Sequence, residues 1–194
     1  MYLFNKDEKA TVQLLGSGVI LREVIKAGQI LRDEYQIHSN VWSVTSFNEL
    51  ARDGMAVEEY NRLHPLEDGK ESWVSQQLRD TDGIVVSATD HMRAYSEQIR
   101  AYLPDSRPYV TLGTDGYGRS DTRSNLRSYF GVDAAHIVVA TLKKLADEGE
   151  VDPRLVKDAI SSFELDVDRP VAWLPQAHPS VQEVAAYTEV TEEK

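Results

Sequence analysis

The chain has 194 residues, of which 41% are hydrophobic and 27% charged, a balance typical of a folded globular domain rather than a disordered segment. Its net charge of −11 disfavours a nucleic-acid partner. The absence of cysteine excludes disulfides and thiolate chemistry and fits a cytoplasmic location. The apolar runs are too short to cross a bilayer and no signal peptide follows Met1, so no membrane partner is expected.

Strand and helix patterns alternate along the chain. Runs of β-formers mark strands, apolar residues three and four positions apart mark helices, and glycine or proline marks their ends. The strands are expected at 11–15, within 37–46, at 83–88 and at 109–112. The helices are expected from 21 to about 35, from 47 to His64, at 72–79, at 91–102, up to Gly131, from Asp133 to Gly149 and from Pro153.

Several helix ends carry their own chemical signals. Ser46 followed by Glu49 forms a capping box, and Asp133 is a favoured cap for the helix that it precedes. Asp152 and the proline after it are typical of a helix start. Gly54 is expected to interrupt the second helix, because glycine weakens a helix interior.

The alternation of strands and helices predicts an α/β fold with a mostly parallel sheet covered on both faces. Residues 1–10 are polar and are expected to form a linker or an incoming arm, and 11–163 the folded domain. Residues 164–194 are expected to be an acidic, extended tail, with Trp173 and Leu174 docking on the domain. From Ser161 onward there are seven Asp and Glu residues against two Lys and Arg.

A glycine-rich turn follows the first predicted strand and precedes a helix. Gly16, Ser17 and Gly18 match the start of a dinucleotide-binding fingerprint, but Leu21 stands where the third glycine belongs. No acidic residue ends the second strand to hold a ribose. The turn is therefore interpreted as a tight connection, or as a weak anion site at the helix start.

Other catalytic patterns are missing from the sequence. There is no P-loop and no serine elbow of the form G-x-S-x-G, and the histidines do not have metal-ligand spacing. Asp90 is expected to cap the helix that begins there rather than to act as an acid or base. The histidines, expected to be structural or solvated, are His38, His64, His91, His136 and His178.

The loop after the fourth predicted strand is the strongest functional candidate, because connections of this kind usually need only about 2–6 residues. Two readings stay open: an interface loop whose charges pair with neighbours, which we favour, and an anion site built on its arginines. Without its neighbours, the segment 116–123 is expected to be mobile. The candidate residues are Asp115, Gly116, Gly118, Arg119, Ser120, Asp121 and Arg123.

Five long segments carry a resemblance to a known family. They are LLGSGVILREV, VWSVTSFNELARDG, YNRLHPLE, ATDHMRAYSEQIRAYLP and LGTDGYGRSDTRSNLRSYFGVDAAHIVVATLKKLADEGE. In this order they resemble the C-terminal region of the homodimeric, thiamine-diphosphate-dependent decarboxylating component of pyruvate dehydrogenase, a relative of transketolase. The resemblance covers about 2–163 and leaves out the acidic tail.

The resemblance implies a transketolase-type C-terminal domain: a three-layer α/β/α fold with five strands, four parallel and one antiparallel. Thiamine diphosphate, magnesium and the catalytic residues would belong to two preceding domains of a longer subunit. No catalytic, cofactor-binding or metal residue is therefore expected in this chain, and its isolated form is expected to be inactive. Met1 would be an internal methionine or an artificial start.

The implied role is assembly, in a subunit that decarboxylates pyruvate and acetylates the lipoyl group of the acyltransferase component. The implied partners are the N-terminal and middle domains, the homodimer partner and that acyltransferase. Two alternatives stay open: a regulatory module that binds a small anion or nucleotide through Gly16, Ser17, Gly18 and Arg119, and a C-terminal domain of a transketolase.

Overall fold

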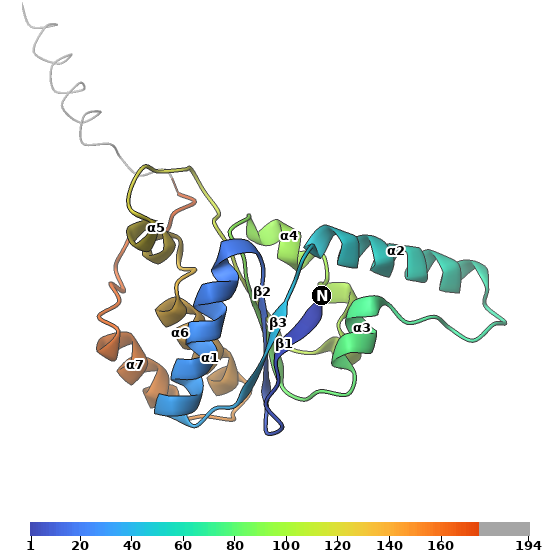
Figure 1. The fold of residues 1–194 in the computed structure, drawn as a ribbon, viewed down its shortest axis with the longest axis horizontal. Coiled ribbons are helices and arrows are strands. Elements are labelled where there is room, and N and C mark those ends of the chain that lie inside the picture. The colour runs from blue at the N-terminus through green and yellow to red at the C-terminus, as the bar shows by residue number, and fades with distance from the viewer. Residues whose placement is uncertain (175–194) are drawn as a thin grey trace, which may run out of the picture.

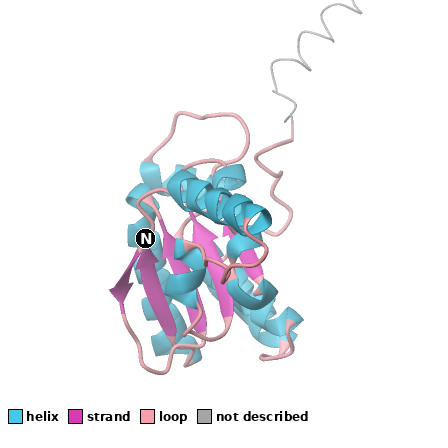
Figure 2. Ribbon diagram, turned by 90° about the vertical axis from the view of Figure 1, so that its right-hand side faces the viewer, coloured by secondary structure: helices cyan, strands magenta, loops and turns pink. Residues whose placement is uncertain are grey.

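The computed structural model describes residues 1–174, which fold around one five-stranded sheet in the order β1-β3-β2-β4-β5. Four neighbouring strands are parallel, and β1 alone runs antiparallel, against β3 (Figure 2). This is the predicted α/β architecture, with its four parallel strands and one antiparallel strand. The strands are β1 (Tyr2–Asn5), β2 (Val12–Gly16), β3 (Ser39–Ser43), β4 (Ile84–Ala88) and β5 (Tyr109–Leu112).

Helices cover both faces of the sheet, giving three layers (Figure 1). Helices α1, α6 and α7 pack on one face and α2, α3 and α4 on the other, while α5 lies at one end. The α-helices are α1 (Leu21–Tyr35), α2 (Phe47–Leu63), α3 (Trp73–Leu78), α4 (Arg93–Glu97), α5 (Arg123–Phe130), α6 (Ala134–Asp147) and α7 (Pro153–Ser162). The short 3-10 helices are η1 (Gly18–Ile20), η2 (Arg100–Tyr102) and η3 (Pro104–Ser106). No helix among residues 1–174 has the length and apolar character needed to span a bilayer.

The two faces of the sheet bury two separate apolar clusters, because successive side chains of a strand point to opposite sides. Val12 and Leu14 of β2 pack with α1, α6 and α7, whereas Leu15 packs with α2 and α3. Each face therefore has its own core, and the central strand β2 is buried along its whole length.

A buried glutamine joins three strands inside the sheet. The Gln13 side chain is fully buried, and its Oε1 accepts hydrogen bonds from Asn40 Nδ2 at 3.1 Å and from Trp42 Nε1 at 2.9 Å. Its Nε2 donates to the carbonyl of Asp82 at 3.0 Å. A buried amide is tolerated when its donors and acceptors are all paired, and this one then fixes the register of β2 against its neighbours.

Residues 1–10, expected to be a linker or an incoming arm, contain a strand that was not predicted. Tyr2–Asn5 form the edge strand β1, with Tyr2 opposite Ser43 of β3. Only Leu3 packs against the core, and the two aromatic side chains beside it stay about half exposed. One inward residue between two exposed aromatic residues gives no alternation of apolar and polar residues, which is why the sequence pattern did not reveal this strand.

Helix α2 is continuous through Gly54, so the predicted interruption is wrong. A side chain at position 54 would overlap the ring of Tyr102, which packs directly over this glycine. The glycine therefore serves close packing rather than a break. The Ser46 cap was predicted correctly, and its hydroxyl accepts from the amide of Glu49 at 3.2 Å.

The helix predicted at 91–102 is broken into α4 and η2. It starts at Arg93 with Met92 in the cap position, so the prediction that Asp90 caps it is wrong. Asp90 lies instead beside Gly18, where a Cβ would come within 2.6 Å of its carboxylate. Helix α4 has no side-chain cap, and the hydroxyl of Thr89 instead closes the turn before the helix, accepting from the amide of His91 at 3.2 Å.

Candidate functional site

Three connections meet where the parallel strands end. The segment after β2 holds the Gly16–Ser17–Gly18 turn, the segment after β4 leads into α4, and the long loop 113–122 follows β5. Parallel strands place their carboxyl ends at one edge of a sheet, the usual place for binding in this class of fold. The structure therefore brings both groups of predicted site residues to the same edge.

The base of the loop 113–122 is held by α4. Arg93 Nε donates to Asp115 Oδ2 at 2.8 Å, and the Thr114 amide donates to the carbonyl of His91 at 2.9 Å. Gly113 is needed here because a Cβ would come within 2.6 Å of that same carbonyl. Asp115, predicted as an interface or anion-loop residue, is thus paired within the chain, by an arginine that the sequence pattern did not single out.

A segment from the end of the chain, which we call the strap (residues 169–174), lies over this loop. Arg169 donates to the carbonyl of Ser128, and Ala172 is buried with its carbonyl against Gly116. Gly116 has φ of +109°, and any side chain there would meet the strap. The strap is the part of the predicted 164–194 tail that the structure places on the domain.

The last residues of the strap contact α4. The guanidinium of Arg93 lies 5.0 Å from the centre of the Trp173 ring, a cation–π distance. Trp173 therefore docks as expected. Residues 175–194, including His178, lie outside the described part of the chain.

The far end of the loop leads into α5. Asp121 Oδ1 accepts from the Asn125 side chain at 2.8 Å, and the Thr122 hydroxyl caps the helix by accepting from the Asn125 amide at 3.3 Å. The guanidinium of Arg119 lies 4.3 Å from the centre of the Tyr129 ring. Ser120 is exposed. Asp121 and Arg119 are thus engaged by α5 of the same chain.

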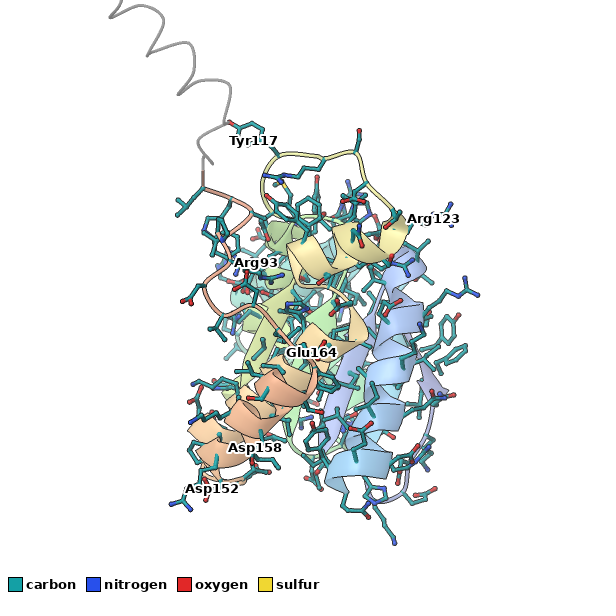
Figure 3. All side chains as sticks on the ribbon, turned by 90° about the vertical axis from the view of Figure 1, so that its left-hand side faces the viewer. Arg93, Tyr117, Arg123, Asp152, Asp158 and Glu164 are labelled. Atoms are coloured by element: carbon teal, nitrogen blue, oxygen red, sulfur yellow. The ribbon has the colours of Figure 1, made fainter. Side chains whose placement is uncertain are left out.

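Two side chains of this region point away from the body of the protein (Figure 3). Tyr117 is 79% exposed at the top of the loop, and Arg123 begins α5 at the loop's other end. An exposed tyrosine on a loop that is anchored at both ends is an unusual use of an apolar side chain, and it marks the outer surface of the loop as available for contact.

The inner surface of the loop closes a cavity of about 480 Å³. Its apolar wall comes from η1, α5 and the residue after Gly131, and its polar groups from Asp90, Thr114 and three arginines. The lining includes the apolar residues Val19, Leu126 and Phe130 and the charged residues Asp90, Arg119 and Arg123. This cavity is where the two predicted groups of site residues come closest, since η1 directly follows the Gly16–Ser17–Gly18 turn.

The weak anion candidate Gly16, Ser17 and Gly18 is engaged in local structure. The Ser17 hydroxyl donates to Thr89 Oγ1 at 2.7 Å and is buried. Gly18 has φ of +55° and lies against the carboxylate of Asp90. Ser17 and Gly18 also line a second hollow of about 340 Å³ with the start of α2. The nearby carboxylate disfavours an anion at this turn, and the anion site stays a prediction.

Helix α5 is anchored to α1 by a buried ion pair that the sequence pattern did not reveal. Arg127 Nη1 donates to Glu23 Oε1 at 2.8 Å, and Glu23 Oε2 accepts from the amide of Ala134 at 3.2 Å. Only 8% of the Glu23 side chain is exposed. Because the glutamate is 104 residues away from its arginine, no local pattern could have found the pair.

Among residues 1–174, no group of three or more His, Asp or Glu side chains is arranged to hold a metal ion. A buried polar cluster surrounds Tyr109, the first residue of β5, which lies at the other end of that strand from the loop 113–122. Its hydroxyl donates to the carbonyl of Ser96 and accepts from the Ser87 hydroxyl, each at 2.9 Å, and burial raises its pKa strongly. The hydroxyl is therefore a neutral, fully paired packing group rather than an acid or base.

Comparison with known proteins gives a consistent family. The model of the transketolase-like TK C-terminal domain matches residues 1–133. The chain is 49% identical over 172 residues to a protein of Pseudomonas aeruginosa named pyruvate dehydrogenase E1 component, covering 87% of this chain and 19% of that protein. It is 50% identical over 164 residues to the Escherichia coli protein of the same name, covering 84% and 18%.

A crystal structure of transketolase from Campylobacter jejuni aligns with a TM-score of 0.48 and 18% identity, over 73% of this chain and 18% of that one. The chain thus spans about a fifth of the length of the curated relatives that it matches.

Proposed function

Because the chain belongs to the family of transketolase-like C-terminal domains, we propose that it is the C-terminal domain of a pyruvate dehydrogenase subunit that transfers acetyl groups. The parent subunit would decarboxylate pyruvate on thiamine diphosphate with magnesium and acetylate the lipoyl group of the acyltransferase component. In this proposal the present chain contributes to the assembly of the subunit rather than to catalysis, and the isolated chain is inactive. The parent subunit is located in the cytoplasm.

The observation that carries this proposal is the construction of the loop 113–122. Its two acidic side chains form contacts within the same chain. Asp115 pairs with Arg93, and Asp121 accepts a hydrogen bond from α5. Its outward side chain is Tyr117, which is 79% exposed, and Met92 before α4 and Tyr95 in α4 are 50% and 40% exposed. A loop that is held at its base and presents an exposed aromatic side chain suits a docking surface.

The direction of β1 adds to this argument. Because β1 is antiparallel, Tyr2 pairs with Ser43, the last residue of β3. The first residue of the chain therefore lies at the same edge of the sheet as the loop 113–122. Preceding domains of a longer subunit would join at this edge, close to the surface that is proposed to receive them.

A chimera tests the proposal. The C-terminal region of the Pseudomonas aeruginosa relative would be replaced by this chain, at the boundaries of the 172-residue match. We expect the chimera to be dimeric and to decarboxylate pyruvate and acetylate a lipoyl domain, whereas the relative truncated before this region does neither. A chimera that is folded and dimeric but inactive would contradict the proposal, as would turnover of pyruvate by the 194-residue chain alone.

A second chimera, in which this chain is grafted onto a transketolase, tests the transketolase alternative. That alternative predicts that the second chimera is active with sugar phosphates. The anion-binding alternative makes a different prediction for the isolated chain: phosphate should shift the amide resonances of Ser17 and Gly18. The carboxylate of Asp90 beside Gly18 favours the docking role over this alternative.

A further inference from the structure

The cavity behind the loop 113–122 has the composition of a small-molecule site. Its volume of about 480 Å³ lies within the range of ligand pockets, about 300–1,000 Å³. Such pockets combine a mainly apolar wall with a few polar groups that set orientation. Here the wall is formed by Val19 of η1 and by Leu126 and Phe130 of α5, and charged groups stand around it.

The charges around the cavity differ in how they are engaged. Arg127 is paired with Glu23, and Arg119 lies over Tyr129. Arg123 is exposed at the start of α5 and has no hydrogen bond or ion pair to another described residue. The Arg123 side chain points outward from the start of α5, at the mouth of the cavity (Figure 3). A carboxylate at this mouth would therefore meet Arg123 without breaking an existing contact, and would gain a charge-assisted hydrogen bond.

The carboxylate of Asp90 limits the charge that the cavity tolerates. Asp90 lines the same space and lies beside Gly18, at the β4 end of the site. A second negative charge near it is disfavoured by repulsion. A ligand with one carboxylate and an uncharged apolar body satisfies both ends, whereas a phosphate is more highly charged and leaves the apolar wall uncovered.

The cavity is formed in advance by contacts that lie outside it. Its loop wall is fixed at Asp115 by Arg93 and at Gly116 by the strap, and its α5 wall is fixed by the pair of Arg127 with Glu23. A ligand therefore has little conformational entropy to remove from the protein on binding.

We propose that this cavity binds a small apolar monocarboxylate, such as an aryl or branched acyl acid, with its carboxylate at Arg123 and its apolar part against Val19, Leu126 and Phe130. The ligand contacts both η1 and the inner side of the loop 113–122. This inference concerns the isolated chain and does not depend on the proposed role in assembly.

The test uses the full 194-residue chain, labelled with nitrogen-15, and three probes: phenylacetate, benzyl alcohol and inorganic phosphate. Phenylacetate is expected to give saturable shifts at the amides of Val19, Gly118 and Leu126, with a Kd of about 1 mM or below. Benzyl alcohol lacks the charge and phosphate lacks the apolar body, so each is expected to bind at least about tenfold more weakly.

Two variants and a matched control complete the test. Arg123→Gln removes the proposed carboxylate partner, and Val19→Asp places a negative charge at the cavity rim on a side chain that is 55% exposed. Each is expected to weaken phenylacetate binding by about tenfold. Arg154→Gln on α7 removes an exposed arginine outside the cavity lining and is expected to leave it unchanged.

Each contrary outcome overturns a defined part of the inference. If benzyl alcohol binds as tightly as phenylacetate, Arg123 does not hold the carboxylate. If phosphate binds as tightly as phenylacetate, the cavity is a simple anion site. An absence of saturable shifts with phenylacetate would mean that there is no site. None of these results bears on the activity of the chimera, so failure here and failure of the proposed function can be told apart.

Discussion

Glu23 of α1 and Arg127 of α5 form an ion pair of 2.8 Å in which the glutamate is almost completely buried. The Glu23 carboxylate also accepts a hydrogen bond from the amide of Ala134, the first residue of α6. One carboxylate therefore joins three helices, at the point where α5 turns into α6. It sets the position of α5, and with it one wall of the cavity.

Removing one member of this pair should be costly, because the other is left buried without its partner. We expect Arg127→Met to lower the free energy of unfolding by about 3 kcal/mol, measured by urea denaturation. Lys26 also approaches Glu23, at 3.8 Å, but is largely exposed. Lys26→Met is the control, expected to cost less than about 1 kcal/mol, and similar losses for both variants would contradict a special role for Arg127.

Gly54 gives a second prediction, with a sign opposite to that of helix propensity. In an ordinary helix interior, Gly→Ala stabilises by about 1 kcal/mol. At Gly54 the new methyl group would overlap the Tyr102 ring, so we expect Gly54→Ala to destabilise by about 1–3 kcal/mol. Gly118→Ala is the control, since no atom lies within 4 Å of its Cβ position. A stable Gly54→Ala protein would mean that Tyr102 moves aside freely.

The strap predicts a gradient of mobility along the loop 113–122. Trp173→Ala removes the ring beneath Arg93, and we expect amide hydrogen exchange at 114–116 to become about tenfold faster. Residues 117–120 should exchange quickly in both proteins, as expected from the sequence for a loop without neighbouring domains. Val167→Ala, at an exposed position before the strap, is the control. Unchanged exchange at Gly116 would show that the strap does not hold the loop.

The residue that caps α6, Asp133, leads us to expect that the stability of the fold depends on pH. Burial raises the pKa of Asp133, but hydrogen bonds from the His136 side chain and amide outweigh this, so that the net pKa is lowered. A lowered carboxylate pKa stabilises the fold above the unfolded value of about 3.9, and this contribution is lost as the pH falls through the folded value.

Asp133→Asn keeps an oxygen acceptor but removes the charge. We expect it to lower the free energy of unfolding by up to about 1 kcal/mol at pH 5 and by less at about pH 2.5. Urea denaturation at the two pH values measures the difference. An equal loss at both would show that the charge of Asp133 does not contribute.

Local chemistry made much of the fold predictable. Ser46, Asp133 and Gly131 were correctly assigned as helix ends, because capping depends on residues within one turn. The four parallel strands were found for a similar reason: each has β-forming residues at its centre and is separated by turn signals from the helix that follows it. The misassigned positions are those that tertiary contacts decide. Gly54 was read as a break, but the ring that packs on it comes from 48 positions further along the chain.

The candidate site was predicted in part. The loop 113–122 stood out by its length and glycines, and it does lie beside the segment that follows Gly18. Its supporting residues were not predicted, because Arg93 and Glu23 act across the fold and carry no local pattern. The cavity itself could not be predicted either, since its shape depends on how α5 sits against η1.

The antiparallel direction of β1 has a practical consequence. Met1 and Leu174, the two ends of the described chain, both reach the rim where the parallel strands finish. The opposite rim of the sheet, with exposed Asp80 in the turn before β4, contains neither of these two ends. A fluorophore or an immobilisation handle placed there would leave the carboxyl-end rim accessible, so single-molecule measurements could test the proposed docking without obstructing that surface.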